Sequence, residues 1–345
     1  MSALPVESTR MYQEAAAAPA ALGVQLARNA ALIATVGAAI RSRAPRAVIT
    51  CARGSSDHAA TYAKYLIETR ARVLTASAAP SVSSVYGIEQ DLSECLFLAI
   101  SQSGQSPDLL ASVAAARSTG ALIVALCNNA DSPLCAAADF AIPLWAGAET
   151  SVAATKSYLA TLVALAHLVA SWTLDAALAE AVQALPAAAA DAWRLDWSAA
   201  LPVLERAEHL YVIGRGLGLG VAQEAALKCK ETCALHAEAY SGAEVRHGPF
   251  ALLGAGFPAF VLAQDDATRP GLEALAAELA ARGVDVLLAG GDSAGATVLA
   301  TLPGPPTVAP VLLAQSMYRL VATLAVRRGR DPDRPPHLSK VTETV

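Results

Sequence analysis

Residues 46–56 read Arg46-Ala47-Val48-Ile49-Thr50-Cys51-Ala52-Arg53-Gly54-Ser55-Ser56, and this stretch decides the fold class. Its first half is a short apolar run with β-branched residues, which predicts a buried strand. Its second half is a turn of small residues, and a helical pattern follows over Asp57–Thr69. A strand, a tight turn and a helix in this order are typical of one unit of a parallel α/β sheet.

The same unit recurs along the first half of the chain. Short strands are predicted at Arg72–Thr75, Cys95–Ile100, Ala121–Cys127 and Asp139–Pro143. A helix is predicted at Asp108–Ser118, and Pro107 suits its first turn. Alternating strands and helices imply a parallel sheet that is covered by helices on both faces.

The second half of the chain repeats the pattern. A strand at His209–Ile213 leads into Gly214-Arg215-Gly216-Leu217-Gly218, and a helix follows to about Glu231. Val48–Gly54 parallels Leu210–Gly216, which predicts two copies of one α/β subdomain. Further strands are predicted at Phe257–Ala263, Val284–Ala289 and Val298–Leu302, and further helices at Gly271–Arg282 and Val311–Arg327.

The expected organisation has five parts. These are an N-terminal helical arm (1–30), a first subdomain (31–172), a helical linker (173–200), a second subdomain (201–330) and a tail that closes over the site (331–345). A helix is predicted over residues 9–42, and a long apolar helix over Ser151–Trp172. The linker is rich in alanine, and Pro186 is expected to break its helix.

Composition limits the classes of function. Hydrophobic residues make up 54% of the chain and charged residues 16%, which is typical of a globular protein. The net charge is −5 and no basic stripe is present, so no nucleic-acid partner is expected. Six cysteines without a C-x-x-C pair indicate buried thiols in a reducing cytoplasm, without a metal. No signal peptide or membrane span is expected either.

A hydroxyl-rich turn is the first candidate for a binding site. Ser101-Gln102-Ser103-Gly104-Gln105-Ser106 follows a strand and opens a helix. Hydroxyls and backbone N–H groups converge at such a helix start, so this turn predicts a phosphate site. Ser55 and Ser56 stand at an equivalent place one unit earlier. The alternative for both turns is ordinary helix capping by serine.

The glycine-rich turn of the second half is interpreted differently. Gly214-x-Gly216-x-Gly218 is a weak dinucleotide pattern, and no acidic residue follows about twenty positions later at the end of a second strand. Asp265 and Asp266 follow the next strand and would repel a phosphate. We therefore expect an anion site in the first half only.

Three charged residues share one face of the helix after this turn. Glu224, Lys228 and Glu231 are spaced i, i+4 and i+7 among alanines that suggest burial. Buried carboxylates need partners or a role, and burial raises the pKa of a carboxylate toward the range useful for proton transfer. An exposed salt-bridged stripe is the alternative.

Two more residues, further along the chain, are candidates for chemistry. His247 precedes Gly248-Pro249, so it lies at a loop tip or a helix end, where an imidazole could move protons near neutral pH. Lys340 lies in the terminal segment, where its amine could form a Schiff base with an open-chain ketose. An ordinary surface histidine and a frayed tail are the alternatives.

Together these segments resemble the sugar isomerase (SIS) domain family, most closely the isomerase half of glucosamine-6-phosphate synthases. The resemblance extends from about residue 10 to the C-terminus. It is carried by Arg53–Ser56, Ser101–Ser106, Ala146–Lys156, Glu224–Glu231, His236–Tyr240, Glu244–Pro249 and Leu338–Lys340. It implies two doubly wound parallel-sheet subdomains, each a flavodoxin-like three-layer α/β/α structure. It also implies a homodimer with shared active sites, and no metal or other cofactor.

The resemblance also implies roles for individual residues. Glu231 would move the proton between C1 and C2, His247 would open the sugar ring from a neighbouring subunit, and Lys340 would act on the carbonyl. Lys228 and Glu224 would line the site. The residues implied to bind the sugar phosphate are Ser55, Ser56, Ser101, Gln102, Ser103, Ser106 and Val152.

Departures from the family's pattern shape the expected reaction. No glutaminase segment precedes the isomerase half, so glutamine is not expected to be used. Ala154 replaces a serine and Cys229 an aliphatic residue. We therefore expect a cytoplasmic enzyme that converts glucosamine 6-phosphate to fructose 6-phosphate and ammonia. The alternatives are a fructosamine-phosphate deglycase, an isomerase subunit of an aminotransferase, and a non-catalytic sugar-phosphate sensor.

Overall fold

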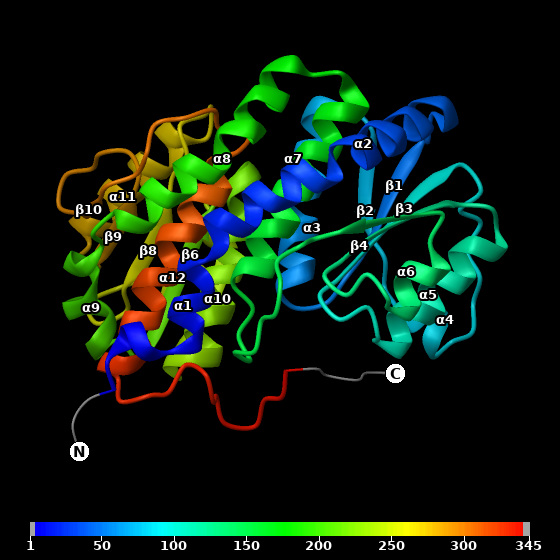
Figure 1. Cartoon of the computed structure of the whole chain (residues 1–345). Helices are drawn as coiled ribbons and strands as arrows, with labels where there is room; N and C mark the ends of the chain where they lie inside the picture. Colours follow the sequence, from blue (N-terminus) through cyan, green and yellow to red (C-terminus); the bar gives the residue numbers. More distant parts are fainter. Residues whose placement is uncertain (1–3, 341–345) are drawn as a thin grey trace. The chain divides into compact units, whose positions relative to one another are not determined.

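The computed structural model describes residues 4–340, so the last five residues of the predicted tail lie outside it. Figure 1 draws the helices and strands. The chain divides into two compact units, and each is described by itself. The first unit holds residues 20–149 and 156–184. The second holds the N-terminal residues through Pro19, residues 150–155 and residues 185–340.

The first unit is built on a five-stranded parallel sheet. Its strand order is β2-β1-β3-β4-β5. The strands are β1 (Ala47–Cys51), β2 (Leu74–Ser77), β3 (Cys95–Ser101), β4 (Leu122–Cys127) and β5 (Phe140–Pro143). The helices are α2 (Ala18–Arg43), α3 (Ser55–Arg70), α4 (Ser81–Ser84), α5 (Pro107–Ser118), α6 (Pro133–Ala137) and α7 (Lys156–Thr173).

The central strand β3 is buried on both faces. Phe97 and Ala99 point to one face, in a core cluster that includes Leu109 of α5. Leu96 and Leu98 alternate with them and are 1% exposed. A strand that is apolar on both sides is what a sheet covered by helices on both faces requires. The predicted layer arrangement of this half is therefore present.

The second unit contains a second five-stranded parallel sheet, of order β10-β9-β8-β6-β7. The strands are β6 (His209–Gly214), β7 (His236–Ser241), β8 (Ala259–Leu262), β9 (Val286–Ala289) and β10 (Thr297–Leu299). The helices are α1 (Arg10–Ala16), α9 (Leu201–Arg206), α10 (Leu219–Cys233), α11 (Arg269–Ala281) and α12 (Ala309–Arg327); α8 (Ala176–Arg194) begins in the first unit.

The two sheets confirm the predicted internal repeat. Counted from β1 or from β6, both sheets have the strand order second, first, third, fourth, fifth. Cys51 pairs with Ala99 and Ile213 pairs with Val261. Gly54 lies three residues after Cys51, and Gly216 lies three residues after Ile213. Their φ angles are 54° and 57°. Gln102 lies three residues after Ala99, and Gln264 lies three residues after Val261, so Gln264 is the counterpart of Gln102.

Two expectations about secondary structure were wrong, and one strand was not expected. Pro186 lies inside α8, and the buried Val182, Leu185 and Ala189 show that the helix keeps an apolar face that offsets the lost hydrogen bond. Helix α7 begins at Lys156 rather than Ser151. Strand β7 was not predicted, because it is a polar edge strand.

Two helices are long and apolar enough to span a membrane by length and composition alone. They are α2 and α12. Of the most apolar window of α12, 78% is buried, as in the core helix of a soluble protein. These helices are therefore weak evidence for a membrane protein.

Candidate active site

Two helix starts lie at one edge of the first unit's sheet. Strands β1 and β3 are parallel neighbours, so their carboxyl ends reach the same edge. Helix α3 begins there with Ser55 and Ser56, and α5 begins there with Ser106 at its N-cap. The serines predicted from the two separate turns therefore gather at one edge, where ligands bind in open parallel sheets.

The hydroxyl-rich turn is held in one tight conformation. The Oγ of buried Ser101 accepts a hydrogen bond of 3.0 Å from the N–H of Gly104. Gly104 has a φ of 67°, and a Cβ there would lie 2.3 Å from Oγ of Ser132 and 2.8 Å from Sγ of Cys127. Only glycine meets both demands. The turn is therefore pre-organised by its own backbone before any ligand binds.

Ordinary capping does not account for the serines of this turn. Ser106 occupies the N-cap of α5, but its side chain makes no capping hydrogen bond. Ser103 accepts only a long bond, 3.4 Å, from the N–H of Gln105. Both serines and Gln102 are half-buried. Hydroxyls at a helix start that do not cap it favour the anion-binding interpretation.

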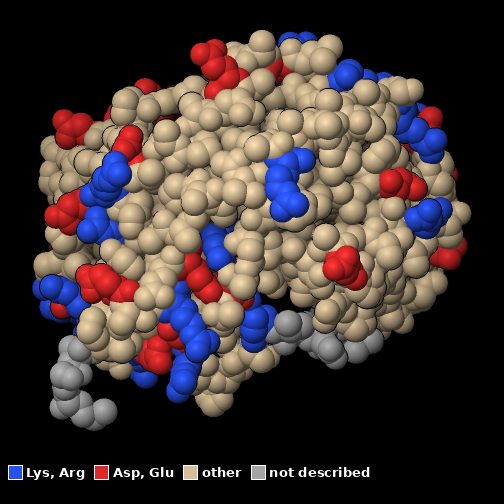
Figure 2. All heavy atoms as spheres, in the orientation of Figure 1, with Lys and Arg blue, Asp and Glu red and all other residues tan. Residues whose placement is uncertain are grey.

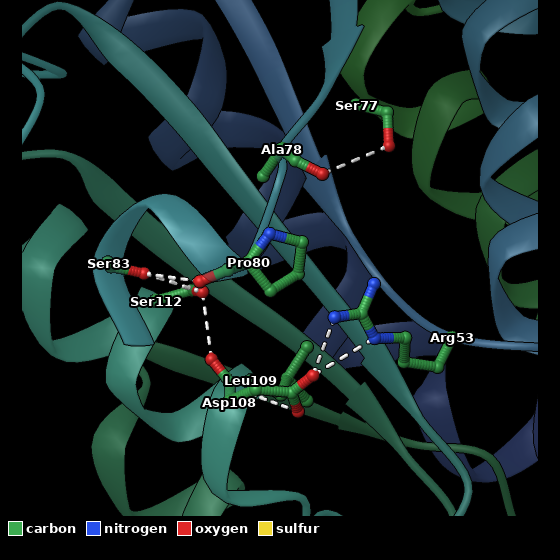
Figure 3. Close-up of polar contacts among 8 residues, drawn as sticks. All are labelled: Arg53, Ser77, Ala78, Pro80, Ser83, Asp108, Leu109 and Ser112. Atoms are coloured by element: carbon green, nitrogen blue, oxygen red, sulfur yellow. Dashed lines mark hydrogen bonds and ion pairs between the residues drawn. The ribbon is translucent and has the colours of Figure 1, made fainter. Parts of the chain in front are cut away.

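An ion pair joins the two helix starts, as Figure 3 shows. Nε and a terminal nitrogen of Arg53 donate to Oδ2 of Asp108 at 3.0 Å and 2.7 Å. The Asp108 side chain is 1% exposed, and its Oδ1 accepts the N–H of Leu109 at 2.8 Å. The same view shows Ser83 of α4 bonded to Ser112 of α5 at 3.0 Å. The sequence alone indicated no role for Arg53 or Asp108, although a carboxylate at the start of an apolar helix was a signal.

Replacing Ser103 with alanine is expected to raise KM for a sugar phosphate about tenfold, because one hydrogen bond to a charged group contributes about 1.5 kcal/mol. We expect kcat to change less than threefold. Steady-state kinetics checks both numbers. Ser118→Ala, at the other end of α5, is the matched control and should leave KM unchanged. An unchanged KM in the Ser103 variant would remove the phosphate site from this turn.

A row of alternating charges is buried in the second unit. Nζ of Lys228 lies 2.5 Å from Oε2 of Glu231 and 3.4 Å from Oε1 of Glu224. The hydroxyl of Tyr318, on α12, donates to Oε1 of Glu224 at 2.9 Å. Glu224 and Lys228 are fully buried, whereas the Glu231 side chain is 19% exposed. The predicted common face of these three residues on α10 is confirmed.

This row can orient a carboxylate for proton transfer. Two carboxylates share one buried ammonium group, so the row carries a net charge of −1. Glu231 is the exposed member, and its position is fixed through Oε2. In the part of the chain that the structure describes, its Oε1 makes no hydrogen bond. A fixed, partly exposed carboxylate oxygen is what a general base needs.

His247 and Glu231 lie at opposite ends of the second unit's sheet. His247 follows the carboxyl end of β7, and its exposed imidazole has no hydrogen-bond partner among residues 4–340. Glu231 lies in the last turn of α10, shortly before the amino end of β7 at His236. Six strand residues span roughly 20 Å. Within a single chain, the second unit therefore does not bring these two side chains together.

The remaining predicted residues lie on two segments of the second unit. Val152 is half-buried in residues 150–155, where the carboxylate of Glu14 accepts the N–H groups of Thr150 and Ser151. Lys340 is half-buried and is the last described residue. Leu338, two residues before it, lines the same cavity as Glu231. The tail therefore passes close to Glu231 just before Lys340.

The glycine-rich turn of the second unit is filled by the protein itself. Nε2 of Gln264 donates to the carbonyl of Arg215 at 3.0 Å. A Cβ on Gly218 would lie 2.2 Å from Oε1 of Gln264. Asp266 accepts the N–H of Thr268 at 2.7 Å, and Asp265 pairs with Arg269 at 2.9 Å. The glycines accommodate the buried Gln264, for which the sequence alone indicated no role.

Fold and site define a class: a protein of two doubly wound α/β subdomains, with a hydroxyl-rich helix start in one and a buried carboxylate–ammonium row in the other. The SIS domain family matches residues 43–171 and 203–327. The chain belongs to this family.

Three known proteins show the extent of the similarity. The glutamine–fructose-6-phosphate aminotransferase (isomerizing) of Aeropyrum pernix is 36% identical over 312 residues, which are 85% of this chain and 50% of the relative. The chain thus spans about half the length of the aminotransferases it matches. A proposed phosphosugar isomerase from Silicibacter pomeroyi DSS-3 superposes with a TM-score of 0.91 at 43% identity, covering 94% of this chain and all of that one. The C-terminal domain of the aminotransferase from Francisella tularensis gives 0.83 at 26% identity, over 95% and 98% of the two chains.

Proposed function

We propose that this protein is a phosphosugar isomerase that converts glucosamine 6-phosphate to fructose 6-phosphate and ammonia. The observation that carries the proposal is the Lys228–Glu231 pair, which holds one partly exposed carboxylate on a buried helix. The match of 36% to an isomerizing aminotransferase supports the same sugar chemistry. A structural stripe would not require a fully buried lysine between two carboxylates, since burial of charge is costly.

The reaction can be divided among the candidate residues. The hydroxyl-rich turn binds the phosphoryl group and fixes the sugar, so that binding energy is used for orientation. His247 opens the ring by moving a proton between the ring oxygen and O1. Glu231 takes the proton from C2 and returns it to C1, which converts the open-chain amino aldehyde to an imine at C2. Water adds to C2, the C2–N bond breaks, and ammonia leaves. Lys340 acts at the carbonyl end.

The proposed enzyme is a cytoplasmic homodimer with shared active sites. The support is the position of His247, which lies at the end of the sheet opposite to Glu231. Since both residues are proposed to act on one sugar, the histidine comes from the neighbouring subunit. An isologous dimer would then form two equivalent sites.

Incubation with glucosamine 6-phosphate alone tests the proposed reaction. We expect equal amounts of ammonia and fructose 6-phosphate, measured by enzyme-coupled assays. Mannosamine and galactosamine 6-phosphates in the same panel define the epimer that is used. Binding of these sugar phosphates without release of ammonia from any of them would overturn the proposal and favour a sensor.

A further inference from the structure

A cavity of about 240 Å³, separate from the one beside Glu231, lies at the carboxyl edge of the second unit's sheet. Residues 263–265 line it directly after β8, and residues 301–304 line it after β10. Arg269 lines it from the first turn of α11, and Leu312 lines it near the start of α12. Ligands bind at this edge of open parallel sheets. None of the lining residues takes part in the proposed isomerisation, so the cavity is a candidate for a second binding site.

The guanidinium group of Arg269 has one edge without a partner. Its Nη1 lies 2.9 Å from Oδ1 of Asp265. Its Nε is buried, and neither Nε nor Nη2 has a hydrogen-bond partner among residues 4–340. Nε and Nη2 form an edge on which a guanidinium group binds a carboxylate through two parallel hydrogen bonds. A buried donor without a partner is costly, so this edge points to a carboxylate as part of the ligand.

The carboxylate of Asp265 limits the charge of the ligand. Its side chain is 71% exposed, and its Oδ2 has no partner in the described part of the chain. This oxygen repels a purely anionic ligand such as phosphate and attracts an ammonium group. Figure 2 shows acidic and basic residues interspersed on the side where α11 lies in Figure 1, without a large group of one sign. The ligand that satisfies Arg269 and Asp265 together carries a carboxylate and an ammonium group close to each other, as an α-amino acid does.

The backbone around Asp265 and Arg269 is held by hydrogen bonds within the same loop. Nε2 of Gln264, which is 2% exposed and lines the cavity, donates to Oδ2 of Asp266 at 2.8 Å. Oδ1 of Asp266 accepts the N–H of Thr268 at 2.7 Å. A loop that is ordered before the ligand arrives loses little conformational freedom on binding, which favours affinity.

Apolar side chains supply the rest of the recognition. Four leucines and a proline also line the cavity: Leu195, Leu302, Pro303, Leu312 and Leu313. We propose that this cavity binds a free α-amino acid with an aliphatic side chain. The amino acid's carboxylate lies on the free edge of Arg269, its ammonium group lies on Asp265, and its side chain lies among the leucines. The volume is slightly below the roughly 300–1,000 Å³ of sites for drug-sized ligands, which suits so small a molecule.

Calorimetry with L-leucine and two analogues tests this assignment. Leucinamide lacks the carboxylate, and 4-methylpentanoate lacks the ammonium group. We expect each analogue to bind at least about tenfold more weakly than L-leucine, because each loses a hydrogen bond between charged groups. Arg269→Gln should weaken the binding of L-leucine at least about tenfold for the same reason. Arg282→Gln, just past the other end of α11 and also ion-paired with a glutamate, is the matched control and should leave binding unchanged.

The outcomes decide this assignment whether or not glucosamine 6-phosphate is converted. Binding of L-leucine that depends on Arg269 and on both charged groups of the ligand supports it. The assignment is overturned if L-leucine, valine and isoleucine all fail to bind the wild type, if leucinamide binds as well as L-leucine, or if inorganic phosphate displaces L-leucine. It is also overturned if Arg269→Gln binds L-leucine normally. Should that variant fail to fold, Asp265→Asn, at an exposed position, replaces it and should weaken binding by a similar factor.

Discussion

Replacing Glu231 with glutamine is expected to lower kcat for glucosamine 6-phosphate at least about a thousandfold, because the substitution removes the proposed base for the C1–C2 proton transfer. KM should change less than threefold, since the proposed phosphate site lies in a different part of the chain. Glutamine keeps the size of the side chain and its acceptor oxygen for Lys228. Steady-state kinetics checks the loss of kcat, and KM together with the affinity for fructose 6-phosphate checks that binding is retained.

The fold of this variant should survive. Lys228 keeps Glu224 as a counterion at 3.4 Å, so the buried ammonium group is not left alone. We expect the thermal midpoint to fall by only a few degrees, which corresponds to about 1 kcal/mol. Glu180→Gln, an exposed glutamate on α8, is the control. Full turnover by the Glu231 variant, or loss of turnover together with a collapsed melting curve, would show that Glu231 is structural.

Local patterns were sufficient to predict most of the fold. Apolar runs that end in small residues, such as Val48–Gly54, predicted the strands and the parallel sheets. The reason is that a strand buried on both faces must consist of a nearly continuous run of apolar residues. Strand β7 was missed because an edge strand needs no continuous apolar run, and its inward residues alternate with polar ones. The internal repeat contained the missing signal, since β2 is the matching edge strand of the first unit.

The helical part of the candidate site was also predictable. A spacing of i, i+4, i+7 places Glu224, Lys228 and Glu231 on one face of any helix, whatever surrounds it. Partners that are distant in sequence could not be predicted in this way. Gln264 and Gly218 meet only because β8 pairs with β6, and Tyr318 reaches Glu224 only because α12 packs beside α10. Such contacts depend on tertiary structure rather than on local spacing.

Mixing two inactive variants is expected to restore activity if the subunits share their active sites. Glu231→Gln and His247→Ala homodimers should each retain below about 1% of wild-type turnover, because each lacks one of the proposed proton-transfer groups at both sites. After mixing and reassociation, half of the dimers would contain one subunit of each kind. Each mixed dimer then has one site with both native residues, so the mixture should recover about a quarter of wild-type activity.

The separation of the two residues is the physical basis of this recovery. His247 lies past the carboxyl end of β7, and Glu231 lies shortly before its amino end. Because a strand lies between them, the two residues of one chain cannot both act on one sugar. In two copies related by a twofold axis, each subunit can supply its His247 to the site that contains the other subunit's Glu231. The double variant, mixed with itself, is the control and should stay inactive. No recovery from the two single variants, in a mixture shown by mass spectrometry to contain mixed dimers, would mean that His247 does not serve a neighbouring subunit's Glu231.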